Sequence, residues 1–142
     1  VSDPDAGAVY ESFDDLAGKK VYATTATNQA AMAETYLEEN PDAFELIYGE
    51  YNNEQIVQAI TSGAVDASLA PKYQVDNWNR SFDENLAIGS EPVHNSDAYL
   101  LFNKETDQAF IDAVNTALEE LKADGTIKEL SEEYLDGDYV PE

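Results

Sequence analysis

The chain has 142 residues, of which 30 are acidic and 7 basic, so its formal net charge is −23. This acidity excludes nucleic acid and anionic membrane surfaces as binding partners, because both require a basic patch on the protein. The hydrophobic fraction of 43% predicts a folded core, and the absence of cysteine excludes disulfides and thiolate metal sites.

The first half of the chain alternates predicted strands and helices. Residues 1–11 are polar and are interpreted as a leader or linker. A helical turn is predicted over 13–16, with Ser12 as its N-cap and acidic residues in its first turn. Apolar or alternating residues then predict strands, each followed by a helix, at 19–24, 44–48 and 65–69.

The helices that follow these strands begin at recognisable caps. Thr27 or Asn28 caps the first, which ends before Pro41. Asn52 caps the second with Gln55 three residues later, a capping-box spacing. Gly63 ends the second helix. Pro71 takes the first position of a third, short helix that runs to about Asn79.

The second half predicts two more strands and two amphipathic helices. The strands lie at 86–88 and 97–103. Apolar residues recur at helical spacing to form one stripe: Phe110, Ile111, Val114, Ala117, Leu118 and Leu121. Gly125 ends that helix, Thr126 caps the next, and Gly137 ends the last. Strands that alternate with helices predict an α/β fold, a three-layer arrangement in which helices cover both faces of a sheet with parallel pairs.

In such a sheet, ligands bind at the carboxyl ends of the strands. The loops expected there are 24–28, 49–52 and 69–72. The first combines three threonine hydroxyls and an asparagine with the free N–H groups of a helix N-terminus, which suits a carboxylate. The same residue types are also ordinary helix caps, so local sequence leaves both interpretations open.

No catalytic or metal-binding set emerges from the motifs. His94 is the sole histidine, and His94 and Glu50 are the only candidates for acid–base chemistry in a cleft. A zinc site is not expected from one histidine without cysteine, and the acidic pairs have no calcium-loop spacing. These pairs are interpreted as solvated helix faces, and Arg80 as a surface residue beside an aromatic. We expect no cofactor and no enzymatic activity.

Three phrases together resemble one protein family. They are SFDDLAGKKVYATTATNQ at 12–29, SGAVDASL at 62–69 and ALEELKADGTIKELSEEYLDGDYV at 117–140. They resemble the polar amino-acid solute-binding proteins of bacterial ABC importers, with the cystine-type members most similar. The resemblance implies a type 2 periplasmic-binding-protein clamshell, of which this chain would be a fragment.

The family pattern also implies a domain organisation. Residues 12–103 would be the second ligand-binding lobe, including the returning hinge strand at 97–103, after the leader at 1–11. Residues 104–142 would be helices that pack on the first lobe, which the chain does not contain. Without that lobe, these helices would either fold onto the second lobe or pair with another chain, by self-association or by exchange of elements.

The resemblance carries over only part of the ligand site. The family's carboxylate-binding loop matches Ala26 and Thr27, flanked by Thr25 and Asn28, with alanine where the family has glycine. The family's amine-binding acid falls at Pro71, next to Lys72, and proline cannot supply a charge. The resemblance implies a polar amino acid or a cystine-like molecule as ligand. The proline leaves two alternatives open: the ligand is a larger or modified amino acid or a peptide, or its amine is bound by another group.

The implied function is the solute-binding component of an amino-acid importer, which delivers its ligand to a membrane permease. The implied location is extracellular or periplasmic, with a lipid anchor at full length. The alternative from the same fold is a ligand-sensing domain of a receptor or regulator. A dehydratase-type enzyme is the third reading, since fold alone does not determine function.

The acidic excess supports either simple solubility or adaptation to a salt-rich habitat. In the second case the fold should be lost in low salt, because close-spaced carboxylates then repel one another without screening. Circular dichroism across a salt series measures this directly. Full stability in low salt would contradict the habitat hypothesis.

Overall fold

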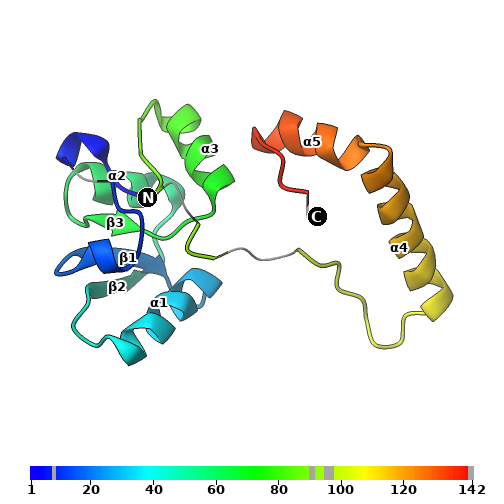
Figure 1. Ribbon diagram of the computed structural model, residues 1–142, viewed down its shortest axis with the longest axis horizontal. Helices are drawn as coiled ribbons and strands as arrows, with labels where there is room; N and C mark the ends of the chain where they lie inside the picture. The colour runs from blue at the N-terminus through cyan, green and yellow to red at the C-terminus, as the bar shows by residue number, and fades with distance from the viewer. Residues whose placement is uncertain (8, 90–91, 95–97, 141–142) are drawn as a thin grey trace. The chain divides into compact units, whose positions relative to one another are not determined.

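A three-stranded parallel sheet organises the first of two compact units, Val1–His94 and Asn95–Glu142 (Figure 1). The computed structural model describes residues 1–7, 9–89, 92–94 and 98–140. The strands of the sheet are β1 (Lys20–Thr24), β2 (Glu45–Gly49) and β3 (Ala67–Ser68). Their spatial order is β2-β1-β3, and both pairs are parallel, which confirms the predicted sheet class.

Strand β3 is shorter than the predicted strand at 65–69. Hydrogen bonds of the same ladder nevertheless continue on both sides of it. The Asp66 N–H donates to the Lys20 carbonyl at 2.8 Å, and the Leu69 N–H donates to the Tyr22 carbonyl at 3.4 Å. The ends of the predicted strand are therefore hydrogen-bonded to β1, but only Ala67 and Ser68 form a regular strand.

A helix follows each strand, and the predicted caps of the first two helices are confirmed. The helices that follow the strands are α1 (Asn28–Glu39), α2 (Asn53–Thr61) and α3 (Lys72–Phe82). The Thr27 hydroxyl accepts from the Ala30 N–H at 3.2 Å. Asn52 and Gln55 exchange side-chain and backbone hydrogen bonds of 2.9 and 3.0 Å, which completes a capping box. Each cap satisfies an N–H that the helix itself leaves without a partner.

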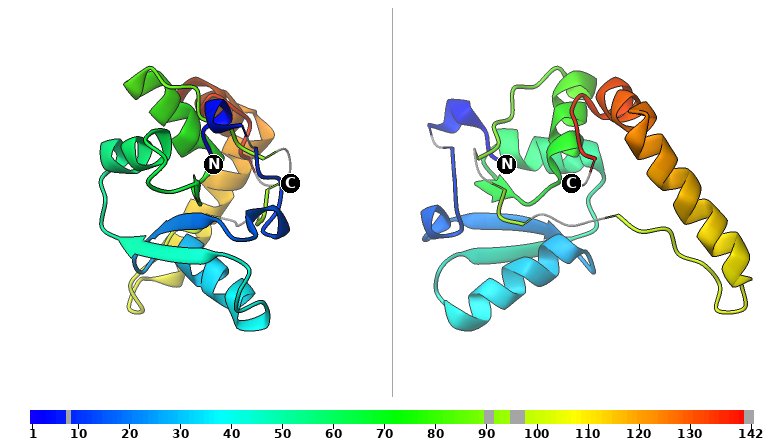
Figure 2. Two further views of the ribbon diagram at one scale, coloured as in Figure 1. Left: turned by 90° about the vertical axis from the view of Figure 1, so that its left-hand side faces the viewer. Right: turned by 45° about the vertical axis from the view of Figure 1, so that its right-hand side comes forward.

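Helices cover both faces of the sheet, as Figure 2 shows with α1 on one side and α2 and α3 on the other. Adjacent residues of β1 point to opposite faces, as a strand requires. Tyr22 packs in a cluster with α2 and α3 that includes Ile56, Val75 and Trp78. Val21 packs in the cluster on the other face. Its other buried members are Leu16, Ala33, Phe44 and Ala67.

Two predicted helix starts need correction. The turn at Asp14–Leu16 is a 3-10 helix, and Ser12 does not cap it. Instead the Asp15 carboxylate accepts from the Ser12 N–H at 3.0 Å and from its hydroxyl at 3.1 Å. Pro71 is the N-cap of α3 rather than its first helical residue, and the helix continues past Asn79 to Phe82 because Asp83 there adopts the left-handed conformation that ends it.

Two predicted strands are not formed as expected. At 86–88 the structure has only an isolated antiparallel bridge between Ala87 and Ser2. At 97–103, residue 97 lies outside the described residues and 98–103 carry no strand. A strand needs a partner for its backbone groups, and no strand pairs with 98–103 within the described part of the chain.

The first residues of the chain lie against the sheet instead of forming a free linker. The Val1 carbonyl accepts from the Ser68 N–H at 2.9 Å, and the Val1 amino group donates to the Ser68 carbonyl at 2.7 Å. Ser2 exchanges backbone hydrogen bonds of 2.9 and 2.8 Å with Ala87. A short 3-10 turn, Pro4–Ala6, follows.

The second unit contains α4 (Gln108–Ala123) and α5 (Thr126–Leu135), which pack on each other. Asp107 caps α4, with its carboxylate accepting from the Ala109 N–H at 2.7 Å. Thr126 is the first residue of α5 and not its N-cap, because Gly125 occupies the cap position. Gly125 has a left-handed φ of 87°, which glycine adopts more readily than residues with a Cβ. The predicted stripe leaves Phe110 57% exposed.

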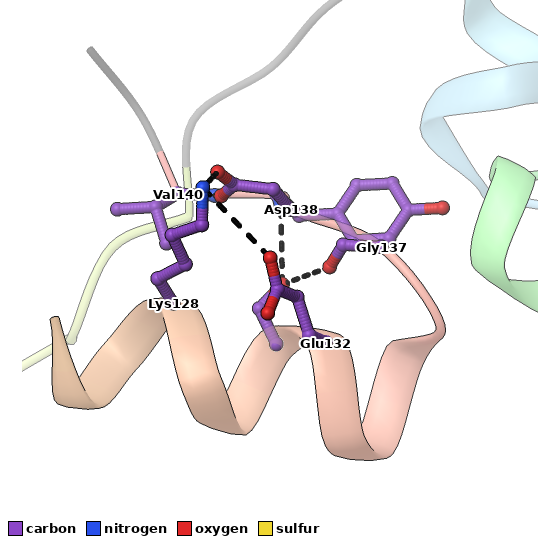
Figure 3. A network of polar contacts seen from close by, with 7 residues as sticks. Lys128, Glu132, Gly137, Asp138 and Val140 are labelled. Atoms are coloured by element: carbon purple, nitrogen blue, oxygen red, sulfur yellow. Dashed lines mark hydrogen bonds and ion pairs between the residues drawn. The ribbon is translucent and has the colours of Figure 1, made fainter.

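A polar network closes the end of α5 (Figure 3). Lys128 lies 2.9 Å from Asp138 and 3.8 Å from Glu132. The Ser131 hydroxyl donates to the Gly137 carbonyl at 2.6 Å, which folds the tail back onto the helix. Asp138 raises the pKa of Lys128, and Lys128 lowers the pKa of Asp138.

The loop after β1 predicts a stabilising substitution. Ala26 has a φ of 59°, a left-handed conformation that costs an L-residue about 1 kcal/mol or more. Ala26→Gly should therefore raise the free energy of unfolding by up to about 1 kcal/mol, after the larger entropy of unfolded glycine is subtracted. Ala31→Gly, at an exposed position of α1, should lower it by about 1 kcal/mol. Urea denaturation measures both, and an equal loss in the two variants would contradict the left-handed turn.

Candidate functional site

A pocket of about 270 Å³ lies at the carboxyl ends of β1 and β3. This is the edge at which parallel α/β sheets bind ligands. Its walls come from the loops after the strands and from α1, α2 and α3, the helices labelled in Figure 1. The lining residues are Thr24, Thr27, Gln29, Tyr51, Asn53, Ile56, Leu69, Ala70, Pro71, Gln74 and Trp78.

One wall is the N-terminus of α1. Thr27 caps it, and its hydroxyl also donates to the Thr24 carbonyl at 2.7 Å, which holds the cap in one orientation. The Asn28 and Gln29 N–H groups have no hydrogen-bond acceptor among the described residues. The left-handed Ala26 turns the chain into this helix start, so alanine keeps the backbone geometry expected of glycine.

A second wall is aromatic. The Tyr51 ring stacks on the Tyr22 ring with centroids 4.9 Å apart and planes 5° apart. The Tyr51 N–H donates to the Tyr22 phenol oxygen at 3.0 Å. Tyr22 is fully buried and Tyr51 is 45% exposed, so a core residue positions a residue of the pocket wall.

The third wall joins α2 and α3. The Gln74 side-chain amide donates to the Asn53 side-chain oxygen at 3.1 Å. Trp78 closes the base and is 1% exposed, and its indole N–H has no partner within the described part of the chain. The pocket therefore has an apolar base beneath neutral amides.

None of the side chains that line the pocket is charged. Lys72 stands just outside, where its ammonium group lies 2.7 Å from the Asp76 carboxylate across one helical turn. Asp66 pairs with Lys19 at 3.6 Å and accepts from the Lys20 N–H at 2.9 Å, so it secures the start of β1 instead of facing ligand. Recognition in this pocket depends on hydroxyl, amide, backbone and aromatic groups.

The predicted site residues are only partly brought together. Thr27 and Pro71 line the pocket. Ala26, Asn28 and Lys72 lie beside it, and so does Thr25, whose hydroxyl donates to the Gly49 carbonyl at 3.3 Å. Their contact with a ligand stays a prediction.

Sequence reasoning missed the lining residues that lie within the helices: Gln29, Asn53, Ile56, Gln74 and Trp78. For Gln29, Asn53, Ile56 and Gln74 the signal was available in principle, because the first turn of each helix after a strand faces the same edge of the sheet. Trp78 lies one turn further along α3 and had no such signal.

The residues considered for acid–base chemistry lie elsewhere. His94 and Glu50 are exposed and do not line the pocket. Among the described residues, no group of three or more histidine or acidic side chains could hold a metal ion. No helix in the same residues is long and apolar enough to cross a membrane.

Curated proteins with similar sequences are mainly cystine-binding proteins. The L-cystine-binding protein TcyK of Bacillus subtilis is 30% identical over 129 residues, which are 91% of this chain and 47% of TcyK. TcyJ of the same organism is 27% identical over 125 residues, 88% of this chain and 46% of TcyJ. The chain thus spans about half the length of the curated relatives it matches, and no family model matches it.

Solved structures agree with the sequence matches. The probable amino-acid ABC transporter extracellular-binding protein ytmK of Bacillus subtilis is 28% identical with a TM-score of 0.85, over 95% of this chain and 58% of ytmK. A putative L-cystine ABC transporter protein of Listeria monocytogenes is 29% identical with a TM-score of 0.73, over 96% and 58% of the two chains. The chain is therefore a homologue of the amino-acid solute-binding proteins of ABC importers, with a type 2 periplasmic-binding-protein fold, and corresponds to about half of such a protein.

Proposed function

We propose that this chain forms part of the ligand-binding component of an amino-acid ABC importer. The ligand is a polar amino acid or a cystine-like molecule, bound at the carboxyl edge of the sheet and passed to a membrane permease. The observation that carries the proposal is the uncharged pocket at this edge in a chain 30% identical to a cystine-binding protein. The relatives TcyK and TcyJ are L-cystine-binding proteins, and a structure with the same fold holds L-arginine.

The ligand carboxylate would lie at the start of α1. The free N–H groups of Asn28 and Gln29 and the positive end of the helix dipole favour an anion there. Thr25, Ala26 and Thr27 shape the loop that brings the carboxylate to those groups. The Thr27 hydroxyl is already committed to its cap, so the backbone supplies most of the binding.

The remainder of the ligand would extend toward α3. Pro71 begins this helix without a side-chain charge, and Lys72 is paired with Asp76. An acid at this position would fix an amino group by an ion pair, and Pro71 cannot. The amino group must then be recognised by neutral groups of this pocket or by residues outside this chain.

The proposed role also assigns the other parts of the chain. Residues 12–103 form the second ligand-binding lobe, and the 104–142 helices pack on the first lobe of the complete protein. The half-exposed apolar side of α4, which has no buried residue, supports such a missing partner surface. Binding and release need no catalytic group. The protein works outside the cytoplasm, lipid-anchored to the membrane at full length.

A pocket-filling substitution tests the proposal. At about 270 Å³ the pocket is slightly smaller than ligand sites of about 300–1,000 Å³, so the affinity for a free amino acid should be low. Trp78 is the sole tryptophan and lines the pocket, so its fluorescence reports on occupancy. L-cystine and L-arginine should change it saturably.

Ala70→Leu places a larger side chain in the pocket and should abolish this change. Ala31→Leu is the matched control, because Ala31 is exposed on α1 and does not line the pocket. Equal responses in both variants, or no saturable response to any amino acid in the unmodified chain, would refute the proposed site.

A further inference from the structure

We propose that the Tyr51 ring is the part of this pocket that binds the cationic group of the ligand, its ammonium or guanidinium group. The inference rests on the proposed function and names the contact that replaces the missing acid. It follows from three observations: how rigidly Tyr51 is held, what else lines the pocket, and how the chain is charged.

The Tyr51 ring is held by the core. One face stacks on Tyr22, and the Tyr51 backbone N–H is bonded to the Tyr22 phenol oxygen. Tyr22 itself fits because position 49 is glycine. A Cβ at Gly49 would lie 3.1 Å from the Tyr22 ring, closer than ordinary van der Waals contact. The ring is thus oriented before ligand arrives, which reduces the entropy lost on binding.

Chemistry then selects the class of group that the ring binds. No carboxylate lines the pocket, so the electron-rich face of an aromatic ring is the strongest attraction available to a cation there. The side-chain oxygen of Gln74 can also accept a hydrogen bond from the cation, because the contact of that amide with Asn53 uses its N–H group. The Trp78 indole lies at the base, where its N–H is buried.

The long-range field points the same way. With a net charge of −23, the protein attracts cations toward its surface and repels anionic ligands. A cation that enters the pocket meets no fixed positive side chain, since Lys72 stands outside it and is paired with Asp76. Contact with the Tyr51 ring orients the bound cation, and the negative net charge of the protein favours the approach of the cation from solution.

The test compares two probes of the same shape, methylguanidinium and methylurea, which differ in charge. Trp78 fluorescence and the Tyr51 ring NMR signals report binding of each probe. Cation–π contacts at exposed sites are worth about 0.5–1 kcal/mol, so the unmodified chain should prefer methylguanidinium about 2- to 5-fold. Equal affinities, or no saturable shift with either probe, would overturn the inference.

Variants assign the preference to one ring. Tyr51→Phe keeps the aromatic face and should keep the preference, whereas Tyr51→Leu should lose it. Tyr48→Leu is the matched control, because Tyr48 lies in β2 and is 49% exposed but does not line the pocket. Tyr22→Phe removes the acceptor of the Tyr51 N–H and should weaken the preference while retaining the stacked core. A preference that survives in Tyr51→Leu would overturn the inference.

The outcome separates this inference from the proposed function. If L-cystine or L-arginine still binds Tyr51→Leu as tightly as the unmodified chain, the importer role stands and the Tyr51 contact is wrong. If no amino acid binds the unmodified chain while methylguanidinium does, the cation site stands and the proposed function is wrong.

Discussion

Burial of β1 on both faces is the constraint on which the first unit depends. Val21, Tyr22 and Ala23 are each fully buried, and the two core clusters meet across this one strand. Each cluster covers apolar surface worth about 25 cal/mol per Å² removed from water. Because Tyr22 also positions Tyr51, the residue that organises the core organises one wall of the pocket as well.

Ionic interactions contribute little to this fold. Ion pairs such as Lys19 with Asp66 and Lys128 with Asp138 join exposed side chains. Exposed pairs are worth at most about 1 kcal/mol each, and 7 basic residues cannot neutralise 30 acidic ones. The core and the backbone hydrogen bonds therefore stabilise the protein against its own charge, and that charge remains available to attract cationic ligands.

The two units differ in how far they bury their apolar side chains. The first contains all sixteen of the buried hydrophobic residues found in the described part of the chain. In the second, α4 buries none, and the apolar stripe predicted for it remains partly exposed. The apolar stripe of an amphipathic helix normally packs against another apolar surface. The exposed stripe of α4 and the match to about half of each curated relative both support a partner surface outside this chain. We propose that the surface that completes α4 belongs to the first lobe of the complete protein.

Local patterns determined most of the elements. Helix caps at Thr27 and Asn52 and the breaks at Gly63 and Gly125 act within one turn, so their residues alone predicted where helices begin and end. The alternation of elements determined the parallel sheet, and the three phrases identified the family. Strands 86–88 and 97–103 could not be judged in this way, because a strand exists only through a partner that may lie far along the chain.

The pocket was decided by tertiary structure. Sequence indicated the correct edge of the sheet and two of its lining residues, Thr27 and Pro71. The Tyr22–Tyr51 stack and the Asn53–Gln74 bond join residues 29 and 21 positions apart, which no local pattern connects. Composition and short-range pattern thus determined the charge, the helices and the class of fold. Folding alone decided which neutral side chains face one another, because that depends on how the helices pack across the sheet.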